Sequence, residues 1–479
     1  MAAASKNNGK KASADVRLEH DLLGDKQIPA DAYYGVQSAR AMENFSISGV
    51  KLFLYPDIIK GLAMVKLAAA RANHDCDPKA MPKDVLKGIE AACKDLLAGE
   101  LHEQFAIDVF QGGAGTSTNM AANEVIANRA LEHMGKKKGE YKYCDPHDHV
   151  NLAQSTNDAY PSALHVAMML GNDRLVEELN RLVKAFQRKG KEFAGIVKMG
   201  RTQLQDAVPM TLGQEFGAWA KSLADEVAAL RAVERVLCEV NMGGTAIGTG
   251  LNAPAGYAEK CAAHLAKITG RPIQLAHDLV EATQDTQSYV LYSSVLKSLA
   301  IKLSKICNDL RLLSSGPRAG LREINLPAMQ PGSSIMPGKV NPVIPEVVNQ
   351  VCFRVIGSDM TITMAAEAGQ LQLNVMEPVI AACIFESQML FINAAASLRT
   401  NCVDGITANE DVCRRLVEQS IGIVTALNPV LGYETATSLA AEALRTGKGV
   451  VELVREKKLM TDAKIKEVLD PKKMAGTVR

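Results

Sequence analysis

The chain has 479 residues and a formal net charge of +1, and its residues are 47% hydrophobic and only 4% aromatic. A nearly neutral chain has no overall field that would attract nucleic acid or an anionic membrane. Low aromatic content, together with plentiful Ala and Leu, favours helices over a β-sandwich, and the length is ample for several domains.

No secretory signal is visible, and no uninterrupted apolar run approaches the ~18 residues of a membrane span. The ten cysteines are scattered from Cys76 to Cys413 without a C-x-x-C pair. In a large chain of this kind we expect them to be reduced and mostly buried. We therefore expect a cytoplasmic protein.

The N-terminal third of the chain changes character at about residue 15. Residues 1–14 are small, polar and basic, and we expect a disordered tail without a targeting role. In residues 15–153, Gly and Pro divide the chain into short pieces, with helical patterns around Ile59–Asn73 and Pro82–Ala98. This stretch predicts an α-rich N-terminal domain.

Helical patterns lengthen in residues 154–405. Glu281–Ser315 contains neither Gly nor Pro, and its apolar residues recur every three or four positions. Similar stripes in Leu212–Val240 and Pro345–Glu367 predict a bundle of long helices whose core can run between subunits. Shorter patterns in residues 406–479 predict a small C-terminal domain. The expected fold is all-α, with a central long-helix bundle and two smaller domains.

Three polar clusters precede or interrupt these helices. They are the segments Gln111–Met120, Asn151–Pro161 and Met199–Ala207. The first has three glycines before an expected helix start, where backbone N–H groups suit an anion, but it lacks the G-K-[ST] of a phosphate loop. Taken alone, the first two are better explained as helix caps, and the third can equally be a polar turn that connects helices.

A histidine-containing stretch, Asp145-Pro146-His147-Asp148-His149, holds residue types that bind metals. It lacks the regular spacing and the further ligands of a zinc site. We therefore expect no metal site there.

The fourth cluster, Gly332–Pro342, combines adjacent serines with a lysine and an asparagine in a loop marked by Gly and Pro. Neutral donors with one lysine suit a small dicarboxylate. A base that removes the proton beside one carboxylate creates an aci-carboxylate dianion, which preplaced donors stabilise more than the ground state. A serine held by backbone N–H groups near a cation can serve as that base, and loop closure would exclude water.

The Gly332–Asn341 loop resembles the signature of the aspartase/fumarase superfamily. The other three clusters match the remaining motifs of that superfamily in the same order, and the resemblance runs from about Arg17 to Leu469. It implies a homotetramer with a 20-helix bundle core and active sites shared between three subunits. The implied activity is elimination of a group from a succinyl-type substrate to give fumarate.

Several positions resemble the aspartase branch more than the fumarases. Ala114 stands where fumarases usually carry serine, Thr156 is the aspartase threonine, and Gln203 stands where fumarases have a histidine. Resemblance to the aspartase branch implies reversible anti-elimination of ammonia from L-aspartate without a cofactor. It does not decide whether Mg²⁺ activates the enzyme. Fumarate hydratase is the alternative. A structural protein that has lost its activity would be expected to lose the loop residues, and they are present.

The resemblance also assigns roles to individual residues. Ser333 is implied as the general base that takes the β-carbon proton. The residues implied to bind the β-carboxylate are Thr116, Ser155, Thr156 and Ser334. Those implied to hold the amino group are Asn157 and, nearby, Gln203, and those implied to hold the α-carboxylate are Thr202, Lys339 and Asn341. Arg40 lies in a matched segment near the site, with a less defined role. Asp145 replaces the first residue of a second anion site of some fumarases, so that site is not expected here.

Overall fold

The structure is a computed structural model, and it describes residues 15–470. The predicted tail, residues 1–14, lies outside the described residues. The described chain forms two compact units. Unit 1 comprises the described residues up to Asp173, with Ala232–Ser294 and Ser358–Ser387; unit 2 comprises Arg174–Arg231, Val295–Gly357 and the residues from Gln388 onward. The predicted domains 15–153, 154–405 and 406–479 stay a prediction.

The elements of unit 1 are short helices, 3₁₀ or π turns (η) and short strands. They are β1 (Val16–Asp21), β2 (Gly24–Pro29), α1 (Val36–Asn44), η1 (Leu52–Leu54), α2 (Pro56–Cys76), α3 (Lys83–Ala98), η2 (His102–Gln104), α4 (Thr116–His133), η3 (Pro146–Val150), η4 (Glu234–Cys238), β5 (Glu239–Val240), α7 (Tyr257–Thr269), β6 (Gln274–Leu275) and α8 (Leu279–Gln284).

Unit 2 has its own set of short elements. They are β3 (Val197–Thr202), β4 (Gln205–Thr211), β7 (Ile324–Asn325), η5 (Val403–Gly405), β8 (Thr407–Ala408), α12 (Glu410–Gln419), η6 (Ile421–Ile423), α13 (Val424–Leu431), α14 (Tyr433–Thr446), α15 (Val450–Glu456) and α16 (Asp462–Val468). Five longer helices have residues in both units. They are α5 (Thr156–Glu192), α6 (Leu212–Val233), α9 (Gln287–Leu313), α10 (Val343–Glu367) and α11 (Glu377–Asn401).

The all-α prediction is confirmed, because the strands of the described residues form only four two-stranded sheets. The helical patterns of the N-terminal third appear as α2 and α3, and the Gly- and Pro-free stretch contains α9. One of the two interpretations left open for Met199–Ala207, a turn that joins helices, is wrong, because the segment is part of the antiparallel hairpin β3–β4. Its polar side chains gave no alternation of apolar and polar residues by which a strand is recognised.

The core of unit 1 is centred on α2, which packs against α3 and α7. Ile59 and Leu62 on this helix are completely buried. Between them, Gly61 faces the backbone of α5, and a Cβ at this position would collide with the Ala163 carbonyl oxygen. The small residue thus allows α2 and the first turns of α5 to approach closely.

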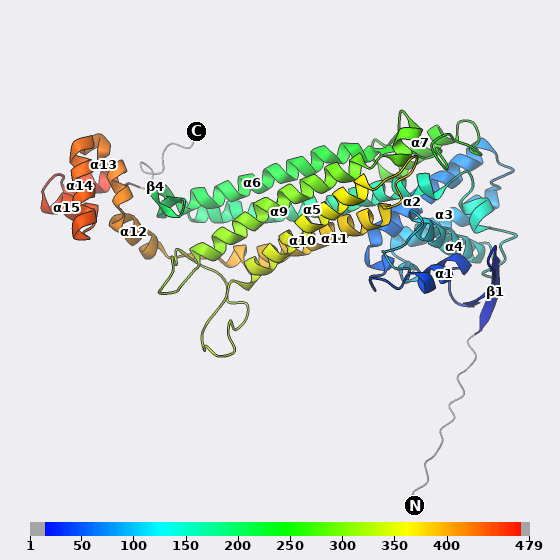
Figure 1. The fold of residues 1–479 in the computed structure, drawn as a ribbon, viewed down its shortest axis with the longest axis horizontal. Helices are drawn as coiled ribbons and strands as arrows, with labels where there is room; N and C mark the ends of the chain where they lie inside the picture. The colour runs from blue at the N-terminus through cyan, green and yellow to red at the C-terminus, as the bar shows by residue number, and fades with distance from the viewer. Residues whose placement is uncertain (1–14, 471–479) are drawn as a thin grey trace, which may run out of the picture. The chain divides into compact units, whose positions relative to one another are not determined.

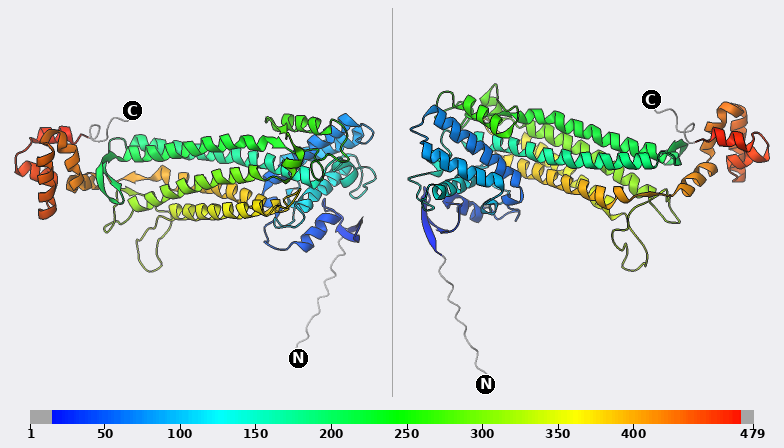
Figure 2. Two further views of the ribbon diagram at one scale, coloured as in Figure 1. Left: turned by 45° about the horizontal axis from the view of Figure 1, so that its top comes forward. Right: turned by 180° about the vertical axis from the view of Figure 1, so that it is seen from behind.

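Within unit 2, segments of the five long helices run side by side (Figures 1 and 2). An aromatic cluster joins α5 and α6 and the residue that follows α5, with ring centroids 4.8 to 6.1 Å apart; its members are Phe186, Phe193, Phe216 and Trp219. A second apolar cluster packs the C-terminal helices against β3 through Met199. The hairpin is therefore packed against the C-terminal helices.

The ten cysteines are all free, and nine of them are buried, which confirms the expectation of reduced, buried thiols. Among residues 15–470, the segment Glu377–Gly405 is long and apolar enough by composition to cross a membrane. Of its most apolar window, 61% is buried inside the structure, as in the core helix of a globular protein. A search for uninterrupted apolar runs does not detect this helix because polar residues interrupt it.

Candidate active site

The first two polar clusters meet in unit 1 at the N-terminal ends of α4 and α5. Gly115, with φ of 89°, lies against the ring of Tyr160, so that a Cβ here would clash with the ring. One turn into α4, the Asn119 amide donates to the Thr156 hydroxyl at 3.2 Å. The two segments that sequence analysis singled out separately are therefore in direct contact.

The second cluster is a helix cap, as its residue types suggested. The Ser155 backbone N–H donates to the Asp158 carboxylate at 3.0 Å, and the Ser155 hydroxyl accepts from the Asn157 N–H at 3.2 Å. This reciprocal arrangement is a capping box. Asp158 also accepts from two further backbone N–H groups, and burial raises its pKa to about 6. The cap fixes the backbone while Ser155, Thr156 and Asn157 all remain half-buried rather than sealed in the core.

The other groups of this end of unit 1 are also held by local bonds. Thr116 is exposed, and its hydroxyl donates to the Gly113 carbonyl at 2.7 Å. The Asn157 amide donates to the Ala246 carbonyl at 2.8 Å.

A buried lysine that sequence analysis missed lies beneath these segments. Lys66 of α2 is completely buried, and its ammonium donates to Asn151 Oδ1 at 3.0 Å and to Gln154 Oε1 at 2.9 Å. The same Asn151 oxygen accepts from the amides of Asn119 and Asn123, both at 3.1 Å. Burial lowers the pKa of Lys66 to about 7, against the opposing effect of the Asp158 carboxylate. The signal available in the sequence was a lysine on the apolar face of a helix, four residues after Leu62.

Replacing Lys66 by methionine should disturb both segments at once. The change leaves Gln154 Oε1, which is half-buried, without its lysine donor, which we expect to cost about 1–3 kcal/mol of folding free energy. Because displacement of site groups by about 1 Å can cost roughly 10²-fold in rate, turnover should fall by about 10- to 100-fold. Lys189→Met is the matched control, since Lys189 is also buried but donates to Ile406 O and Glu192 in unit 2. Equal turnover in the two variants would contradict this role of Lys66.

The pH dependence of stability gives an independent measure of the same lysine. Its pKa in the folded protein, about 7, lies below the ordinary 10.5, so the unfolded chain binds one more proton between these values. The stability contributed by Lys66 must therefore rise with pH over this window and be lost as pH falls toward 7. The groups facing it are Asp158, Cys93 and Cys261. Wild-type Tm, relative to that of Lys66→Met, should rise between pH 7 and pH 9.

Arg40 makes structural bonds in unit 1. Its guanidinium forms a bidentate pair with Asp21, with both N–O distances 2.8 Å, and donates to the Gly24 carbonyl at 2.9 Å. This pairing lowers the pKa of Asp21. Arg40 therefore fastens α1 to the turn of the β1–β2 hairpin, and its guanidinium is already engaged.

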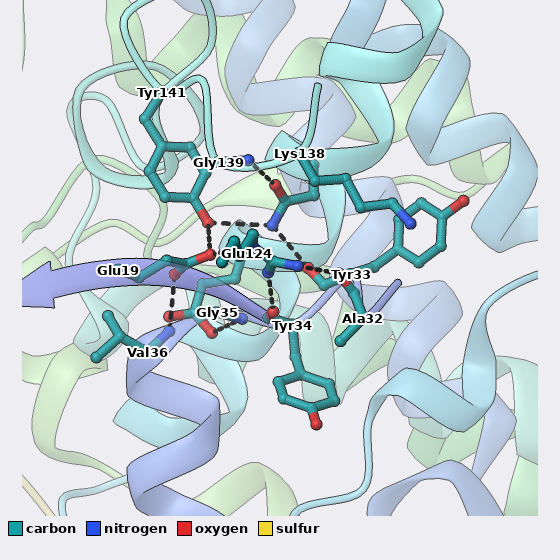
Figure 3. Close-up of polar contacts among 12 residues, drawn as sticks. Glu19, Ala32, Tyr33, Tyr34, Gly35, Val36, Glu124, Lys138, Gly139 and Tyr141 are labelled. Atoms are coloured by element: carbon teal, nitrogen blue, oxygen red, sulfur yellow. Dashed lines mark hydrogen bonds and ion pairs between the residues drawn. The ribbon is translucent and has the colours of Figure 1, made fainter. Parts of the chain in front are cut away.

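The start of α1 is fixed by two acidic side chains (Figure 3). Glu124 of α4 accepts from the backbone N–H of Gly35 at 2.8 Å, and burial raises its pKa. Glu19 of β1 accepts from the Val36 N–H at 2.9 Å and from the Tyr141 hydroxyl at 2.9 Å. Carboxylates at a helix N-terminus satisfy its free N–H groups and its dipole. Helix α1 and helix α4, which begins at Thr116, are thereby locked together.

In unit 2, Thr202 and Gln203 lie at the exposed turn of the β3–β4 hairpin. Thr202 pairs with Gln205 across a two-residue turn, in which Gln203 and Leu204 have φ values of 55° and 63°. Positive φ at both positions is the geometry of a tight hairpin turn. For residues other than glycine it costs about 1–3 kcal/mol each, and such strain is often found at functional sites.

The loop with the two serines is closed at its base by backbone and side-chain bonds. Gly332 N donates to Lys339 O at 2.7 Å, and the Asn341 amide donates to Gly332 O at 2.7 Å. A Cβ at Gly332 would lie 2.7 Å from that Lys339 oxygen, so a glycine is required at this position. Ser334 and Lys339 are exposed. The loop is therefore closed at its base, and residues 334–340 are exposed.

The Ser333 hydroxyl accepts local backbone hydrogen bonds within this loop, as the Asp145 carboxylate does in its turn. The Ser333 oxygen accepts from two successive backbone N–H groups, those of Ile335 at 3.2 Å and Met336 at 3.0 Å. Donors aimed at an oxygen favour its negatively charged form. The arrangement is therefore suited to stabilising a serine alkoxide.

The eleven residues predicted from sequence are divided between the units. Arg40, Thr116, Ser155, Thr156 and Asn157 belong to unit 1; Thr202, Gln203, Ser333, Ser334, Lys339 and Asn341 belong to unit 2. Within unit 1 the Thr116 and Ser155 segments come together. Within unit 2 the loop brings Ser333, Lys339 and Asn341 onto one short closed segment.

The histidine-containing stretch is a capped turn. The Asp145 carboxylate accepts from the backbone N–H groups of His147 and Asp148, at 2.7 and 2.9 Å. Among residues 15–470, no group of three or more His, Cys, Asp or Glu side chains is arranged to hold a metal ion. These side chains are explained by local capping.

The long-helix fold and the order of the polar segments are those of a lyase, the class that a family model identifies. A family model described as lyase matches residues 24–357, and one described as the C-terminus of fumarase C matches residues 423–476. The chain belongs to this lyase family, the aspartase/fumarase superfamily.

Individual relatives refine this assignment. An aspartate ammonia-lyase of Pseudomonas aeruginosa is 59% identical over 462 residues, which cover 96% of this chain and 97% of that protein. The crystal structure of a Brucella melitensis fumarate lyase:delta crystallin bound to cobalt has a TM-score of 0.93 and 53% identity, covering 97% of this chain and 100% of that one. A class II fumarase from Schistosoma mansoni has a TM-score of 0.88 but 33% identity, covering 96% and 99%. The predicted membership in the aspartase branch is confirmed.

Proposed function

We propose that the protein is an aspartate ammonia-lyase, which interconverts L-aspartate with fumarate and ammonia. The 59% identity to an aspartate ammonia-lyase over nearly the whole of both chains supports this activity. The single structural observation that carries the chemistry is the Ser333 oxygen, which accepts two backbone N–H groups in a Gly-closed loop.

In the proposed mechanism, Ser333 acts as an alkoxide and takes a proton from the β-carbon of L-aspartate. The electron pair moves onto the β-carboxylate and gives an aci-carboxylate dianion. Re-formation of the carboxylate then makes the carbon–carbon double bond and breaks the C–N bond at the α-carbon. Ammonia leaves, the abstracted proton ends on it as ammonium, and fumarate remains.

The proposed binding residues stabilise the charges that develop during these reaction steps. The β-carboxylate lies against the hydroxyls of Thr116, Ser155, Thr156 and Ser334. A cradle of preplaced donors lowers the barrier because the dianion gains more from it than the ground state, and one such donor typically contributes roughly 10²–10³ in rate. Lys339, Asn341 and Thr202 hold the α-carboxylate, and Asn157 with Gln203 contacts the amino group. Arg40 supports the site through α1.

The proposed site is completed in a homotetramer, with each site shared between three subunits and a 20-helix core. An apolar stripe on α10 supports association. Phe353, Ile356, Met360 and Met364 recur every three or four residues and are 61%, 36%, 62% and 66% exposed. Large apolar side chains exposed in one row are typical of a surface that is covered by another chain.

The proposed reaction uses only side chains and backbone of the protein, in the cytoplasm and without a cofactor. We expect turnover to persist in EDTA, with Mg²⁺ acting at most as an activator.

The decisive assay offers L-aspartate and L-malate separately to the purified protein and follows fumarate absorbance. We expect fumarate from L-aspartate and little or none from L-malate, because Gln203 and Thr156 resemble the aspartase branch. Light scattering on the same sample should give a tetramer mass. Fumarate from L-malate but not L-aspartate would replace the proposal by fumarate hydratase.

A further inference from the structure

Strand β3 carries two cationic side chains that share one carboxylate, although their spacing would normally separate them. Lys198 and Arg201 are three residues apart, and successive side chains of a strand point to opposite faces. The register of β3 against β4 shifts between Met199 and Arg201. The extra residue of this β-bulge lies on β4, where Ala207 and Val208 lie opposite the single residue Gly200. Lys198 and Arg201 nevertheless both reach the same carboxylate with their long side chains.

Glycine is required on β3 opposite this bulge. A Cβ at Gly200 would lie 2.8 Å from the Val208 carbonyl oxygen on β4. Any larger residue would therefore push the strands apart where the register changes.

The shared carboxylate belongs to Glu323, which is completely buried. Its Oε1 lies 2.6 Å from Arg201 Nη1, and its Oε2 lies 2.9 Å from Lys198 Nζ. Lys198 also pairs with Glu215 of α6 at 2.5 Å. The cluster is neutral overall, and removing one partner would leave a buried charge uncompensated.

The backbone of Glu323 is fixed independently of its side chain. Its N–H donates to Leu313 O at the end of α9, and its carbonyl accepts from Asn409 N, both at 2.9 Å. The next residue, Ile324, begins β7, which pairs with β8. Glu323 is thus a rigid anchor, and the chain that leaves it leads to Gly332 and the serine loop.

We infer that Glu323 is a positioning residue for Thr202, an inference that rests on the proposed function. After the bulge, Thr202 takes the face opposite Arg201 because side chains alternate. Holding Arg201 on the buried carboxylate therefore fixes Thr202 toward solvent, where it is exposed. A slip by one residue would turn Thr202 inward and remove its hydroxyl from the α-carboxylate.

A double-mutant cycle tests the inference with the full-length protein. Glu323→Gln and Thr202→Ala should each raise KM for L-aspartate and the inhibition constant of succinate by about 10-fold, the effect of losing one hydrogen bond to a charged group. If Glu323 acts through Thr202, the KM of the double variant should be no higher than that of the single variant with the larger KM. If the KM increases of the two single variants multiply in the double variant, the inference is overturned.

Glu178→Gln is the matched control. Glu178 is also a buried carboxylate of unit 2 with two cationic partners, Arg399 and Arg181, both at 3.0 Å. We expect it to lower Tm as much as Glu323→Gln while KM stays unchanged. An equal change of KM in both variants would mean a general structural effect and would overturn the inference.

A milder variant covers the case in which Glu323→Gln does not fold. Arg201→Lys keeps the charge but loses the reach of the guanidinium to Oε1, and it should raise KM several-fold with little change in Tm. An unchanged KM would count against the inference. If wild type converts L-malate instead of L-aspartate, the proposed activity fails, and the same cycle run with L-malate still decides the role of Glu323.

Discussion

Ser333→Ala is expected to reduce kcat for L-aspartate by roughly 10²–10⁴-fold, the range that a general base contributes. The variant lacks the hydroxyl that would take the β-carbon proton. A water molecule bound to the two N–H donors would not be held in the orientation of that hydroxyl. KM and Tm should change little, because Ser333 lies on an exposed loop and has no role in the core. The measurement is steady-state fumarate release, together with succinate inhibition to confirm that binding persists.

The neighbouring serine provides the comparison for this variant. Ser334→Ala removes an equal volume from the adjacent position but leaves the two N–H donors aimed at Ser333. We expect a smaller loss, shared between kcat and KM, because Ser334 is proposed to hold the β-carboxylate. Near-normal turnover in Ser333→Ala, or a larger loss in Ser334→Ala, would refute the assignment of the base.

Lys339→Ala should raise KM for L-aspartate by about 10- to 100-fold. A carboxylate that loses its charged hydrogen-bond partner typically loses about 1.5–3 kcal/mol, and 1.4 kcal/mol is one factor of ten. The lysine side chain is exposed, so its truncation leaves no cavity and Tm should be unchanged. The backbone oxygen of Lys339, which closes the loop through Gly332, is retained in the variant.

Lys448→Ala is a suitable control for the loss of an exposed lysine. Lys448 pairs with Glu456 on the surface of the C-terminal helices, at 2.6 Å. Its removal should leave KM unchanged. If Lys339→Ala also leaves KM and succinate inhibition unchanged, Lys339 does not hold the α-carboxylate.

Sequence patterns predicted the parts of this protein whose physics is local. A long segment without Gly or Pro and with apolar residues every three or four positions can bury a face only as a helix, and it contains α9. The Ser155–Asp158 cap was readable because its hydrogen bonds join residues only two and three positions apart. The glycines and prolines of Gly332–Pro342 predicted a loop for the same reason. The motif order placed the chain in its superfamily.

The tertiary structure decided the features that depend on residues far apart in the chain. Thr202 lies on a strand because its hairpin packs against the C-terminal helices, although its polar residues carry no strand pattern. Arg201 and Glu323 are 122 residues apart, and only the folded chain brings both cations of β3 to that carboxylate. Lys66 lies in contact with Asn151 because α2 packs tightly in unit 1. The sequence by itself determined which chemical groups the protein carries and which helices it forms. Only tertiary packing decided which of those groups are buried, which are paired and where they point. These properties depend on contacts between distant residues, which no local sequence pattern contains.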